Sequence, residues 1–387
     1  MTEPCPAAPF AALGLRPDLV AALAKLTITE PTPIQAAGIP VLMEGRDACL
    51  NAETGTGKTL AYLLPVFQRL DLAAAATQAV VLAPTHELAL QIQRQCTDLA
   101  QRANLAVRVL LLIGGTPIDR QIDKLKKKPH IVVGSPGRIQ ELIQMGRLKP
   151  QTVRTVVVDE SDRLLGPDNL APVEKIIQAA APGRQLVFVS ATEQGDSDTV
   201  ITRLAPDAAR VRTAAAAINP AIEHVHLVCE ERDKPDVLRK LLSALQPGRA
   251  MVFVHRNETA EVVAAKLAHH GIAAVDLHGA YDKNERKQAM DDFRSGRAVV
   301  MIASDLASRG LDIPGVTHVF NLDVPTQAKA YLHRVGRTAR AGASGMAVTL
   351  MSHDETRLVR RFETELGISF PEVFLREGRL WSSAHGG

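Results

Sequence analysis

The stretch Ala52-Glu-Thr-Gly-Thr-Gly-Lys-Thr59 organises the first half of the chain. An apolar run at 48–50 precedes it as a strand would, and the run 60–64 follows it with helical character. Glycines between a strand and a helix let backbone N–H groups turn inward around an anion, and the start of the helix adds partial positive charge. The stretch is therefore predicted to bind a nucleotide phosphate, although the general form of such a loop has glycine at position 52.

Each residue type in this loop has a chemical role to play. Lys58 is placed to reach the β- and γ-phosphates, and the Thr59 hydroxyl to ligate a Mg²⁺ that bridges them. The alternative is a glycine-rich turn before a structural helix. The candidate nucleotide-binding residues of the loop are Thr54, Gly55, Thr56, Gly57, Lys58 and Thr59.

The composition is that of a globular protein long enough for two or three domains. Of the 387 residues, 46% are hydrophobic and 22% charged, and 45 basic against 42 acidic residues give a net charge of +3. Such a balance confines any nucleic-acid surface to a local patch. The four cysteines form no Cys-x-x-Cys pair, which argues against a structural zinc and a disulfide framework. No apolar run approaches the length of a membrane span, so we expect a protein of the reducing cytoplasm.

Apolar runs rich in β-branched residues alternate with helical patterns in both halves of the chain. Strands that are apolar throughout and alternate with helices predict parallel sheets covered by helices on both faces, an α/β fold. The expected strands are 79–83, 107–113, 131–133, 156–158 and 186–189 in the first half, and 225–228, 251–254, 273–277, 299–302, 319–320 and 347–350 in the second.

The stretch 206–220 lies between the two halves and lacks the apolar periodicity of a packed element. It carries a run of four alanines and ends in Asn219-Pro220, which favours a linker over the alternative of a short surface helix. The predicted organisation is a nucleotide-binding domain at 1–212, a linker at 213–220 and a second domain at 221–387 that ends in a short tail.

Two carboxylates follow the apolar run 155–158 directly, namely Asp159 and Glu160. Because ligands of a parallel sheet bind at the carboxyl ends of its strands, both are expected beside the phosphate loop. Asp159 is predicted to hold Mg²⁺ together with Thr59, and Glu160 to orient and deprotonate the attacking water. The alternative is an acidic cluster in a solvated turn.

Together with further motifs, these residues make the chain resemble the DEAD-box ATP-dependent RNA helicases. Pro31-Thr-Pro-Ile-Gln35 resembles the glutamine motif of that family, with Phe10 at its upstream aromatic position, and Ala52 is the family's own variant of the phosphate loop. Gln35 presents a donor and an acceptor, as pairing with the adenine edge requires. The resemblance implies two tandem RecA-like domains, ATP and Mg²⁺ as cofactors, RNA as the partner and a monomeric protein.

Further motifs resemble the RNA contacts of that family: Pro84-Thr-His-Glu-Leu-Ala89, Gly114-Gly115 and Ser135-Pro-Gly-Arg138. RNA is expected to be held mainly through phosphates and 2′-hydroxyls, with little sequence preference. The low aromatic content, 3%, argues against base-stacking platforms. The RNA-binding residues that the resemblance implies are Pro84, Thr85, Gly115, Pro136, Gly137, Arg138, Arg286 and Ser304.

The second domain resembles the half of the family's core that closes over ATP, through the stretches 304–312 and 331–340. Arg337 and Arg340 are three residues apart on an expected helix, hence on one face, and are implied to reach the γ-phosphate from that domain. Gly310 and Asp312 are implied to lie at the nucleotide. The residues implied to couple the domains are Asp162, Ser190, Thr192, Arg309, His333 and Arg334, with Arg309 a candidate partner of Asp162. The alternative for each single arginine is a surface charge.

Several positions depart from the family pattern. His86 stands where the family has arginine and lacks the planar fork of donors. Lys283 replaces a glutamine, and Thr27-Ile28 replaces Gly-Phe, which removes one candidate stacking partner for adenine. We therefore expect weaker ATP binding than is typical of the family and little turnover without RNA. The small exchanges, at Ser161, Ser304 and Ser308, are expected to matter little.

Three functions compete on these observations. The favoured one is an RNA-stimulated ATP hydrolase that separates short RNA duplexes when its two domains close. The second is an ATP-gated RNA clamp or remodelling scaffold with little unwinding. The third, a DNA translocase, is disfavoured by the glutamine motif and by Ser190-Ala-Thr192.

Overall fold

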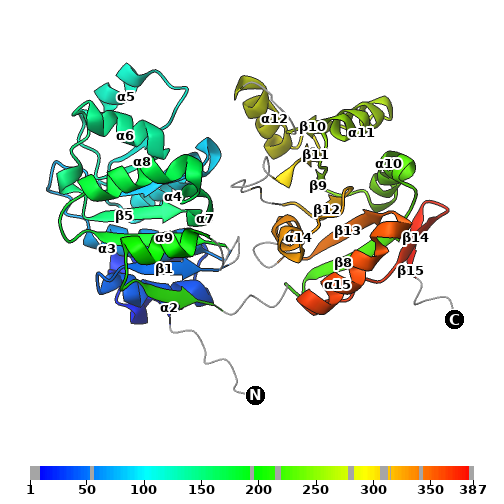
Figure 1. Ribbon diagram of the computed structural model, residues 1–387, viewed down its shortest axis with the longest axis horizontal. Helices are drawn as coiled ribbons and strands as arrows, with labels where there is room; N and C mark the ends of the chain where they lie inside the picture. Colours follow the sequence, from blue (N-terminus) through cyan, green and yellow to red (C-terminus); the bar gives the residue numbers. More distant parts are fainter. Residues whose placement is uncertain are drawn as a thin grey trace, which may run out of the picture. The chain divides into compact units, whose positions relative to one another are not determined.

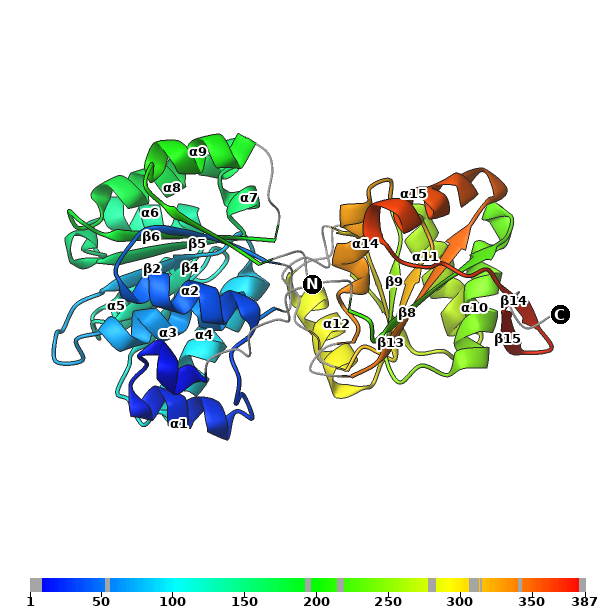
Figure 2. The same ribbon diagram turned by 90° about the horizontal axis from the view of Figure 1, so that it is seen from below.

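The computed structural model describes residues 9–52, 56–191, 196–213, 219–277, 283–305, 313, 315–339 and 343–382. The chain divides into two compact units, Met1–Ala216 and Ala217–Gly387, called here the first and the second unit (Figures 1 and 2). Each unit is built around a parallel sheet with helices on both faces, so the predicted fold class is confirmed. The predicted linker, 213–220, includes residues 214–218, which lie outside the described residues, and the domain boundaries stay a prediction.

The sheet of the first unit has seven described strands in the order β3-β4-β2-β5-β6-β1-β7, and every neighbouring pair is parallel. Because all strands point the same way, the loops after β1, β5 and β6 leave from one edge of the sheet. The strands are β1 (Ala48–Asn51), β2 (Ala79–Leu82), β3 (Val109–Leu112), β4 (Ile131–Gly134), β5 (Thr155–Asp159), β6 (Gln185–Ser190) and β7 (Ala209–Arg212).

Two hydrophobic clusters cover the two faces of this sheet. In one cluster the sheet packs against α1–α4, and in the other against α5–α9. Figure 2 shows α1, α3 and α4 on the opposite side of the strands from α8 and α9. The helices are η1 (Phe10–Leu13), α1 (Pro17–Lys25), α2 (Pro33–Met43), α3 (Lys58–Arg69), α4 (His86–Arg102), α5 (Ile118–Leu125), α6 (Pro136–Gln144), η2 (Pro150–Thr152), α7 (Ser161–Leu164), α8 (Pro167–Ala179) and α9 (Asp196–Leu204).

Proline begins several of these helices, including α2 at Pro33 and α6 at Pro136. The first helical position suits proline because its missing N–H would have no partner within the helix. Both helices bring predicted site residues with them, because Gln35 lies two positions after Pro33 and Arg138 two positions after Pro136. The local sequence thus sets where these side chains enter the fold.

The sheet of the second unit has six described strands in the order β10-β11-β9-β12-β13-β8, again all parallel. Its strands are β8 (Ile222–Val228), β9 (Ala250–Phe253), β10 (Ala274–Asp276), β11 (Val300–Ala303), β12 (His318–Asn321) and β13 (Gly345–Met351). One face packs against α10 and α11, and the other against α12, α14 and α15. The helices are η3 (Glu231–Asp233), α10 (Lys234–Leu245), α11 (Asn257–His269), α12 (Lys283–Ser295), α14 (Ala328–Val335), η4 (His353–Glu355) and α15 (Thr356–Leu366).

Two elements were not expected from the sequence. The stretch 206–220, predicted to lack packed structure, contains β7, which pairs with β1 through backbone hydrogen bonds that its polar composition does not reveal. The predicted short tail contains an antiparallel hairpin of β14 (Val373–Arg376) and β15 (Arg379–Ser382). Among the described helices, none is both long and apolar enough to cross a membrane.

Candidate functional site

The phosphate loop connects β1 to the start of α3, and its residues Thr54 and Gly55 lie outside the described residues. Gly57 caps α3 with a left-handed φ of 86°, which favours glycine. A Cβ at Gly57 would lie 2.3 Å from Gln35 Nε2 and 3.3 Å from Thr32 Oγ1. Gly57 therefore lies in a tight cradle formed with the Gln35 and Thr32 side chains, and a larger residue at position 57 would displace Gln35.

Lys58, the first residue of α3, donates a hydrogen bond from Nζ to the carbonyl oxygen of Ala52. The hydrogen bond holds the ammonium group near the start of the phosphate loop, where the sequence predicts that the β- and γ-phosphates bind. Ala52 in turn donates its N–H to the Ser190 carbonyl oxygen at 3.3 Å, and β1 pairs with β6 so that Asn51 lies opposite Ser190. The phosphate loop and Ser190 are brought together, whereas Thr192 lies outside the described residues.

Gln35 is buried, with 2% of its surface exposed, and it contacts the phosphate loop. Its Oε1 accepts a hydrogen bond from the Thr32 N–H at 2.9 Å, and its Nε2 donates to the Gly57 carbonyl oxygen at 3.0 Å. A carboxamide has two N–H groups and two lone pairs, so one of each remains for the adenine edge. Phe10, predicted to contact adenine, is 2% exposed and packs in the hydrophobic cluster with α1–α4.

Asp159 ends β5 and is 6% exposed. Its Oδ2 accepts a hydrogen bond from the Tyr62 hydroxyl at 2.8 Å, and its Oδ1 one from the Glu160 N–H at 2.9 Å. Burial raises the pKa of Asp159 above its ordinary value, while the Tyr62 hydrogen bond and the charge of Lys58 act in the opposite direction. Glu160 follows with a left-handed φ of 48°, and Asp162 lies on α7.

The residues predicted to hold Mg²⁺ fit that ion. Thr59 and Asp159 both present oxygen atoms, and the Asp159 carboxylate is oriented by the Tyr62 hydroxyl. Magnesium takes one or two protein ligands and completes its octahedron with waters and substrate phosphates. No group of three His, Cys, Asp or Glu side chains suited to a metal occurs among the described residues. Two such oxygen donors suit a magnesium ion held mainly by nucleotide phosphates and water, and magnesium binding stays a prediction.

Sequence reasoning missed Tyr62. It lies three positions after Thr59 on α3, so the two side chains share a face of the helix, and it is fully buried. A hydroxyl within an otherwise apolar stretch, Ala61-Tyr62-Leu63-Leu64, needs a partner when it is buried. That signal could have pointed to the carboxylate at the end of β5.

The predicted RNA-binding residues of the first unit gather after three neighbouring strands, β2, β4 and β3. Thr85, next to Pro84, caps α4 by accepting a hydrogen bond from the Leu88 N–H at 3.2 Å. Arg138 donates from Nη1 to the Thr116 carbonyl oxygen at 3.1 Å, which ties the start of α6, with Pro136 and Gly137, to the loop that holds Gly115. The structure thus groups these motifs at one edge of the sheet, and their contacts with RNA stay a prediction.

Arg334 is the centre of a polar cluster inside the second unit and is fully buried. It donates to both carboxylate oxygens of Asp305, at 2.6 and 2.8 Å. It also donates to Asn321 Oδ1 at 3.3 Å, to the Asp323 carbonyl oxygen at 2.6 Å and to His255 Nε2 at 2.8 Å. These contacts use all five N–H groups of the guanidinium within its own unit. Sequence reasoning missed Asp305, which lies two residues after the end of β11.

The expectation that Arg337 and Arg340 share a helix is wrong for Arg337. Helix α14 ends at Val335, and Arg337 lies in the turn beyond Gly336, where its N–H bonds to the Arg334 carbonyl oxygen at 3.1 Å. The turn is held because the buried Thr338 hydroxyl donates to the Val316 carbonyl oxygen at 2.7 Å. Arg337 itself is 6% exposed.

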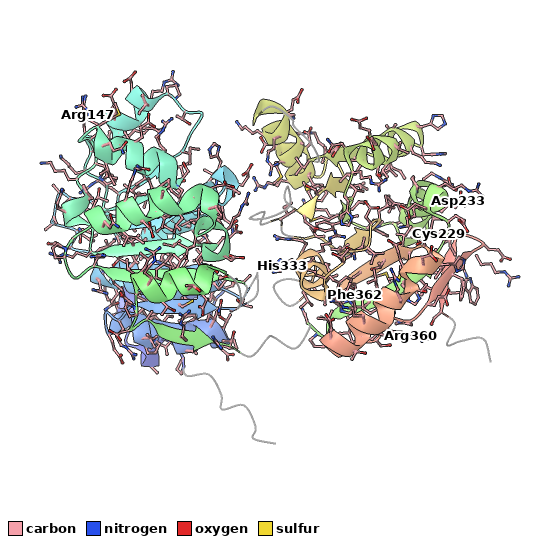
Figure 3. All side chains as sticks on the ribbon, viewed as in Figure 1. Arg147, Cys229, Asp233, His333, Arg360 and Phe362 are labelled. Atoms are coloured by element: carbon pink, nitrogen blue, oxygen red, sulfur yellow. The ribbon has the colours of Figure 1, made fainter. Side chains whose placement is uncertain are left out.

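The other predicted residues of the second unit are placed on separate elements. His333 lies on α14 (Figure 3), Ser304 follows β11, and Arg286 lies on α12. The predicted residues Arg309, Gly310, Asp312 and Arg340 lie outside the described residues.

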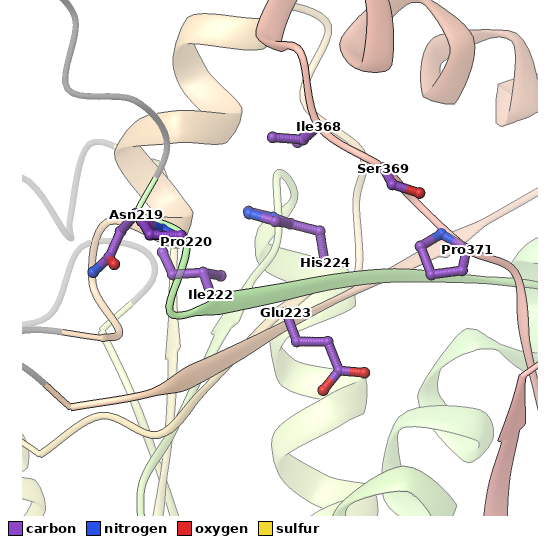
Figure 4. A pocket seen from close by; sticks show the side chains of 8 residues that line it. All are labelled: Asn219, Pro220, Ile222, Glu223, His224, Ile368, Ser369 and Pro371. Atoms are coloured by element: carbon purple, nitrogen blue, oxygen red, sulfur yellow. The ribbon is translucent and has the colours of Figure 1, made fainter.

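A hollow of about 320 Å³ lies on the second unit (Figure 4). It is bounded by the start of β8 and by the segment between α15 and β14. His224 on its wall is 6% exposed; its Nδ1 lies 2.7 Å from the Tyr331 hydroxyl, and its Nε2 has no hydrogen-bond partner among the described residues. Burial lowers the pKa of His224 to about 4, so the imidazole is neutral at pH 7.

Comparison with known proteins agrees with this geometry. The family model of DEAD/DEAH box helicases matches residues 32–199, and that of the helicase conserved C-terminal domain matches residues 233–342. The chain is 37% identical over 364 residues to the DEAD-box ATP-dependent RNA helicase CshC of Bacillus cereus, covering 94% of this chain and 93% of CshC. It is 38% identical over 353 residues to the probable ATP-dependent RNA helicase YfmL of Bacillus subtilis, covering 91% of this chain and 93% of YfmL.

Solved structures show the same fold. Saccharomyces cerevisiae Dbp5 bound to RNA and ADP BeF3 is similar with a TM-score of 0.83 at 28% identity, over 94% of this chain and 95% of that one. Mss116 bound to single-stranded RNA and UDP-BeF is similar in fold, with a TM-score of 0.81 at 23% identity over 94% and 79%. From its two matched domains and its relatives, the chain belongs to the DEAD-box ATP-dependent RNA helicase family and is an ATP-hydrolysing RNA helicase.

Proposed function

We propose that this helicase separates short RNA duplexes locally, with ATP binding driving closure of its two domains around RNA. The observation that carries the proposal is the convergence of the Gly57 cradle, Lys58 and the Tyr62–Asp159 pair at one edge of the first sheet. These groups bind phosphate and magnesium, whereas the arginines predicted to complete the reaction belong to the other unit. Hydrolysis should therefore depend on closure.

The residues of the first unit have distinct roles in this proposal. Lys58 binds the β- and γ-phosphates, Thr59 and Asp159 hold Mg²⁺, and Glu160 orients the attacking water and accepts its proton. When bound, Mg²⁺ supplies positive charge that offsets the charge of the phosphate oxygens. Gln35 selects adenine through its remaining donor and acceptor.

Arg337 and Arg340 are proposed to stabilise charge on the transferring phosphoryl group. Such a group can contribute on the order of 10³–10⁵ in rate, about 4–7 kcal/mol of the barrier. Gly310 and Asp312 are proposed to contact the nucleotide, and Asp162, Ser190, Thr192, Arg309 and His333 to couple the domains. Because all five donors of Arg334 are used within its own unit, Arg334 is proposed to act by positioning its neighbours.

RNA is proposed to bind through its backbone to Pro84, Thr85, Gly115, Pro136, Gly137, Arg138, Arg286 and Ser304. In support, the similar Dbp5 structure at 28% identity is bound to RNA and ADP BeF3. Backbone contacts carry little sequence preference, so any short duplex should serve as substrate. We also propose a monomeric protein that works in the cytoplasm.

A strand-displacement assay tests the proposal. A short RNA duplex with one labelled strand should be separated with ATP and Mg²⁺, and ATP hydrolysis should rise when RNA is added. Retention of RNA in the presence of a non-hydrolysable ATP analogue without displacement would instead favour the clamp. Equal stimulation of hydrolysis by a DNA of matched sequence would favour a DNA translocase.

A further inference from the structure

The hairpin of β14 and β15 has a defined turn and register. Its turn residues, Glu377 and Gly378, have φ values of 50° and 72°, and two left-handed residues are typical of the tight turn that best fits twisted antiparallel strands. The register pairs Phe374 with Trp381 and Arg376 with Arg379. Because side chains alternate between the faces of a strand, these four share one face.

The two faces of the hairpin differ in chemistry. Val373, Leu375 and Leu380 on the inner face pack against the hydrophobic cluster that includes α10 and α11. On the outer face Phe374 is 49% and Trp381 52% exposed, while the Arg376 side chain is 81% exposed. Two aromatic rings therefore lie in solvent directly opposite each other, next to a pair of guanidinium groups.

Further basic side chains lie on α10, which packs on the inner side of the hairpin. A hollow of about 410 Å³ beside the turn is lined by Arg239 and Lys240 of α10 together with Leu375, Glu377 and Gly378 of the hairpin. In this region Asp236 is shared by three cations, at 3.2 Å from Arg239, 2.7 Å from Lys240 and 3.4 Å from Lys266. Arg376 Nε lies 3.8 Å from Glu377 Oε1. Around the turn, Arg376, Arg379, Arg239 and Lys240 thus outnumber the acidic Glu377 and Asp236 (Figure 1 shows α10 beside β15).

We infer that the outer face of this hairpin is a second RNA-binding surface, where bases of a single strand stack on Trp381 and Phe374 and phosphates contact Arg376 and Arg379. The low aromatic content of the chain argued against stacking platforms, but these two rings are exposed together on one face. Every base has a π-face, so stacking on exposed rings is tolerant of sequence. Arg376 and Arg379 beside the rings, with further basic side chains at the turn, suit a polyanion. The inference rests on the proposed function, since the face would supply a further tether for the RNA on which the helicase acts.

The fluorescence of Trp381 tests the inference directly, because Trp381 is the only tryptophan of the chain. A short unstructured single-stranded RNA is titrated into the full chain without nucleotide, while anisotropy of a label on the RNA reports binding. We expect quenching of the tryptophan emission and protection of the ring from acrylamide. Unchanged emission and unchanged acrylamide access at saturating RNA would overturn the inference.

Variants of the same face give a second readout. Trp381→Leu is expected to weaken RNA binding about tenfold, and Trp381→Phe to restore most of it, since one stacked base is lost in the first only. Arg376→Gln with Arg379→Gln should make the log–log dependence of affinity on salt shallower by about 1.4, because each phosphate contact with a single strand contributes roughly 0.7. Unchanged melting temperatures check that the variants fold.

The control is Arg357→Gln with Arg360→Gln on α15, an exposed pair with the same spacing and the same loss of charge (Arg360 is labelled in Figure 3). This control variant should bind RNA with the same salt dependence as the wild type. The inference would be refuted if both double variants changed the salt dependence equally, or if Trp381→Leu bound RNA as tightly as the wild type. A response of Trp381 to polyglutamate but not to RNA would assign the face to an acidic protein and overturn the inference.

Parallel assays separate this inference from the proposed function. If RNA stimulates ATP hydrolysis and strands are displaced while Trp381 does not respond, the hairpin inference fails alone. If Trp381 responds to RNA while duplexes are not separated, the proposed unwinding fails and the hairpin surface stands.

Discussion

The Tyr62 hydroxyl donates a 2.8 Å hydrogen bond to Asp159 Oδ2 across 97 residues of sequence. Both side chains are buried, and the bond joins the first turns of α3 to the end of β5. A carboxylate held from two sides, by Tyr62 and by the Glu160 N–H, has a defined orientation. The proposed magnesium ligand is therefore set before any nucleotide arrives.

Tyr62→Phe removes this bond with little change in volume. The groups behind a metal ligand typically contribute 10–100-fold to metal affinity, so we expect the Mg²⁺ concentration for half-maximal ATP hydrolysis to rise about tenfold. Binding of a fluorescent ADP should weaken in Mg²⁺ but not in EDTA. Equal weakening in both buffers would show that Tyr62 supports only the fold.

Gly57→Ala places a Cβ 2.3 Å from Gln35 Nε2 at a left-handed φ. ATP affinity is expected to fall at least tenfold, measured by calorimetry, because the cradle must open. The matched control is Gly183→Ala, which is also left-handed, at 71°, but has nothing within 4 Å of the added Cβ. The control should cost only about 1 kcal/mol of stability and leave ATP affinity intact.

Lys58→Ala and Glu160→Gln should separate binding from hydrolysis. The first removes the proposed phosphate ligand, so both nucleotide affinity and hydrolysis should be lost. The second keeps the shape of the side chain but not its basicity, so ATP should bind while turnover falls and RNA is retained in the closed state. Unchanged nucleotide affinity in Lys58→Ala, or normal turnover in Glu160→Gln, would contradict these roles.

Asp305→Ala leaves the buried Arg334 without its carboxylate partner. Removing one member of a buried pair typically costs about 3–5 kcal/mol, and the partial exposure of Asp305, 37%, places the expected loss near the lower figure. Urea unfolding measures this change. Arg361→Ala, which breaks an exposed pair with Glu365, should cost less than about 1 kcal/mol.

The buried His224 should make stability depend on pH. In the folded chain its pKa is about 4, below the ordinary histidine value of 6.5, so on acidification the unfolded chain takes up the extra proton at a higher pH than the folded chain does. Stability is therefore lost as pH falls from about 6.5 to 4, by roughly 3 kcal/mol at most. His224→Gln cannot titrate, and its unfolding free energy should fall less over this window; parallel pH profiles would exclude the effect.

The local motifs and the α/β class could be read from the sequence because each depends on short-range chemistry. Apolar runs between helical patterns predict parallel strands, and the Gly-Lys-Thr end of the loop predicts phosphate binding. The strand β7 could not be found in this way, because its partner β1 lies far away in the chain and its own residues are half polar. The hairpin of β14 and β15 could not be found either, because its stretch of sequence was expected to be part of a short tail.

By itself the sequence predicted the phosphate-binding residues, located the carboxylates at the end of β5 and indicated the family, because residue type and spacing along one strand, turn or helix suffice for these. Only the tertiary structure decided which partners those residues meet. It placed Tyr62 against Asp159, used all five donors of Arg334 within its own unit, and set Arg337 in a turn beyond α14. Such contacts join residues far apart in sequence, and they follow from how buried polar groups find partners when the sheets and helices pack.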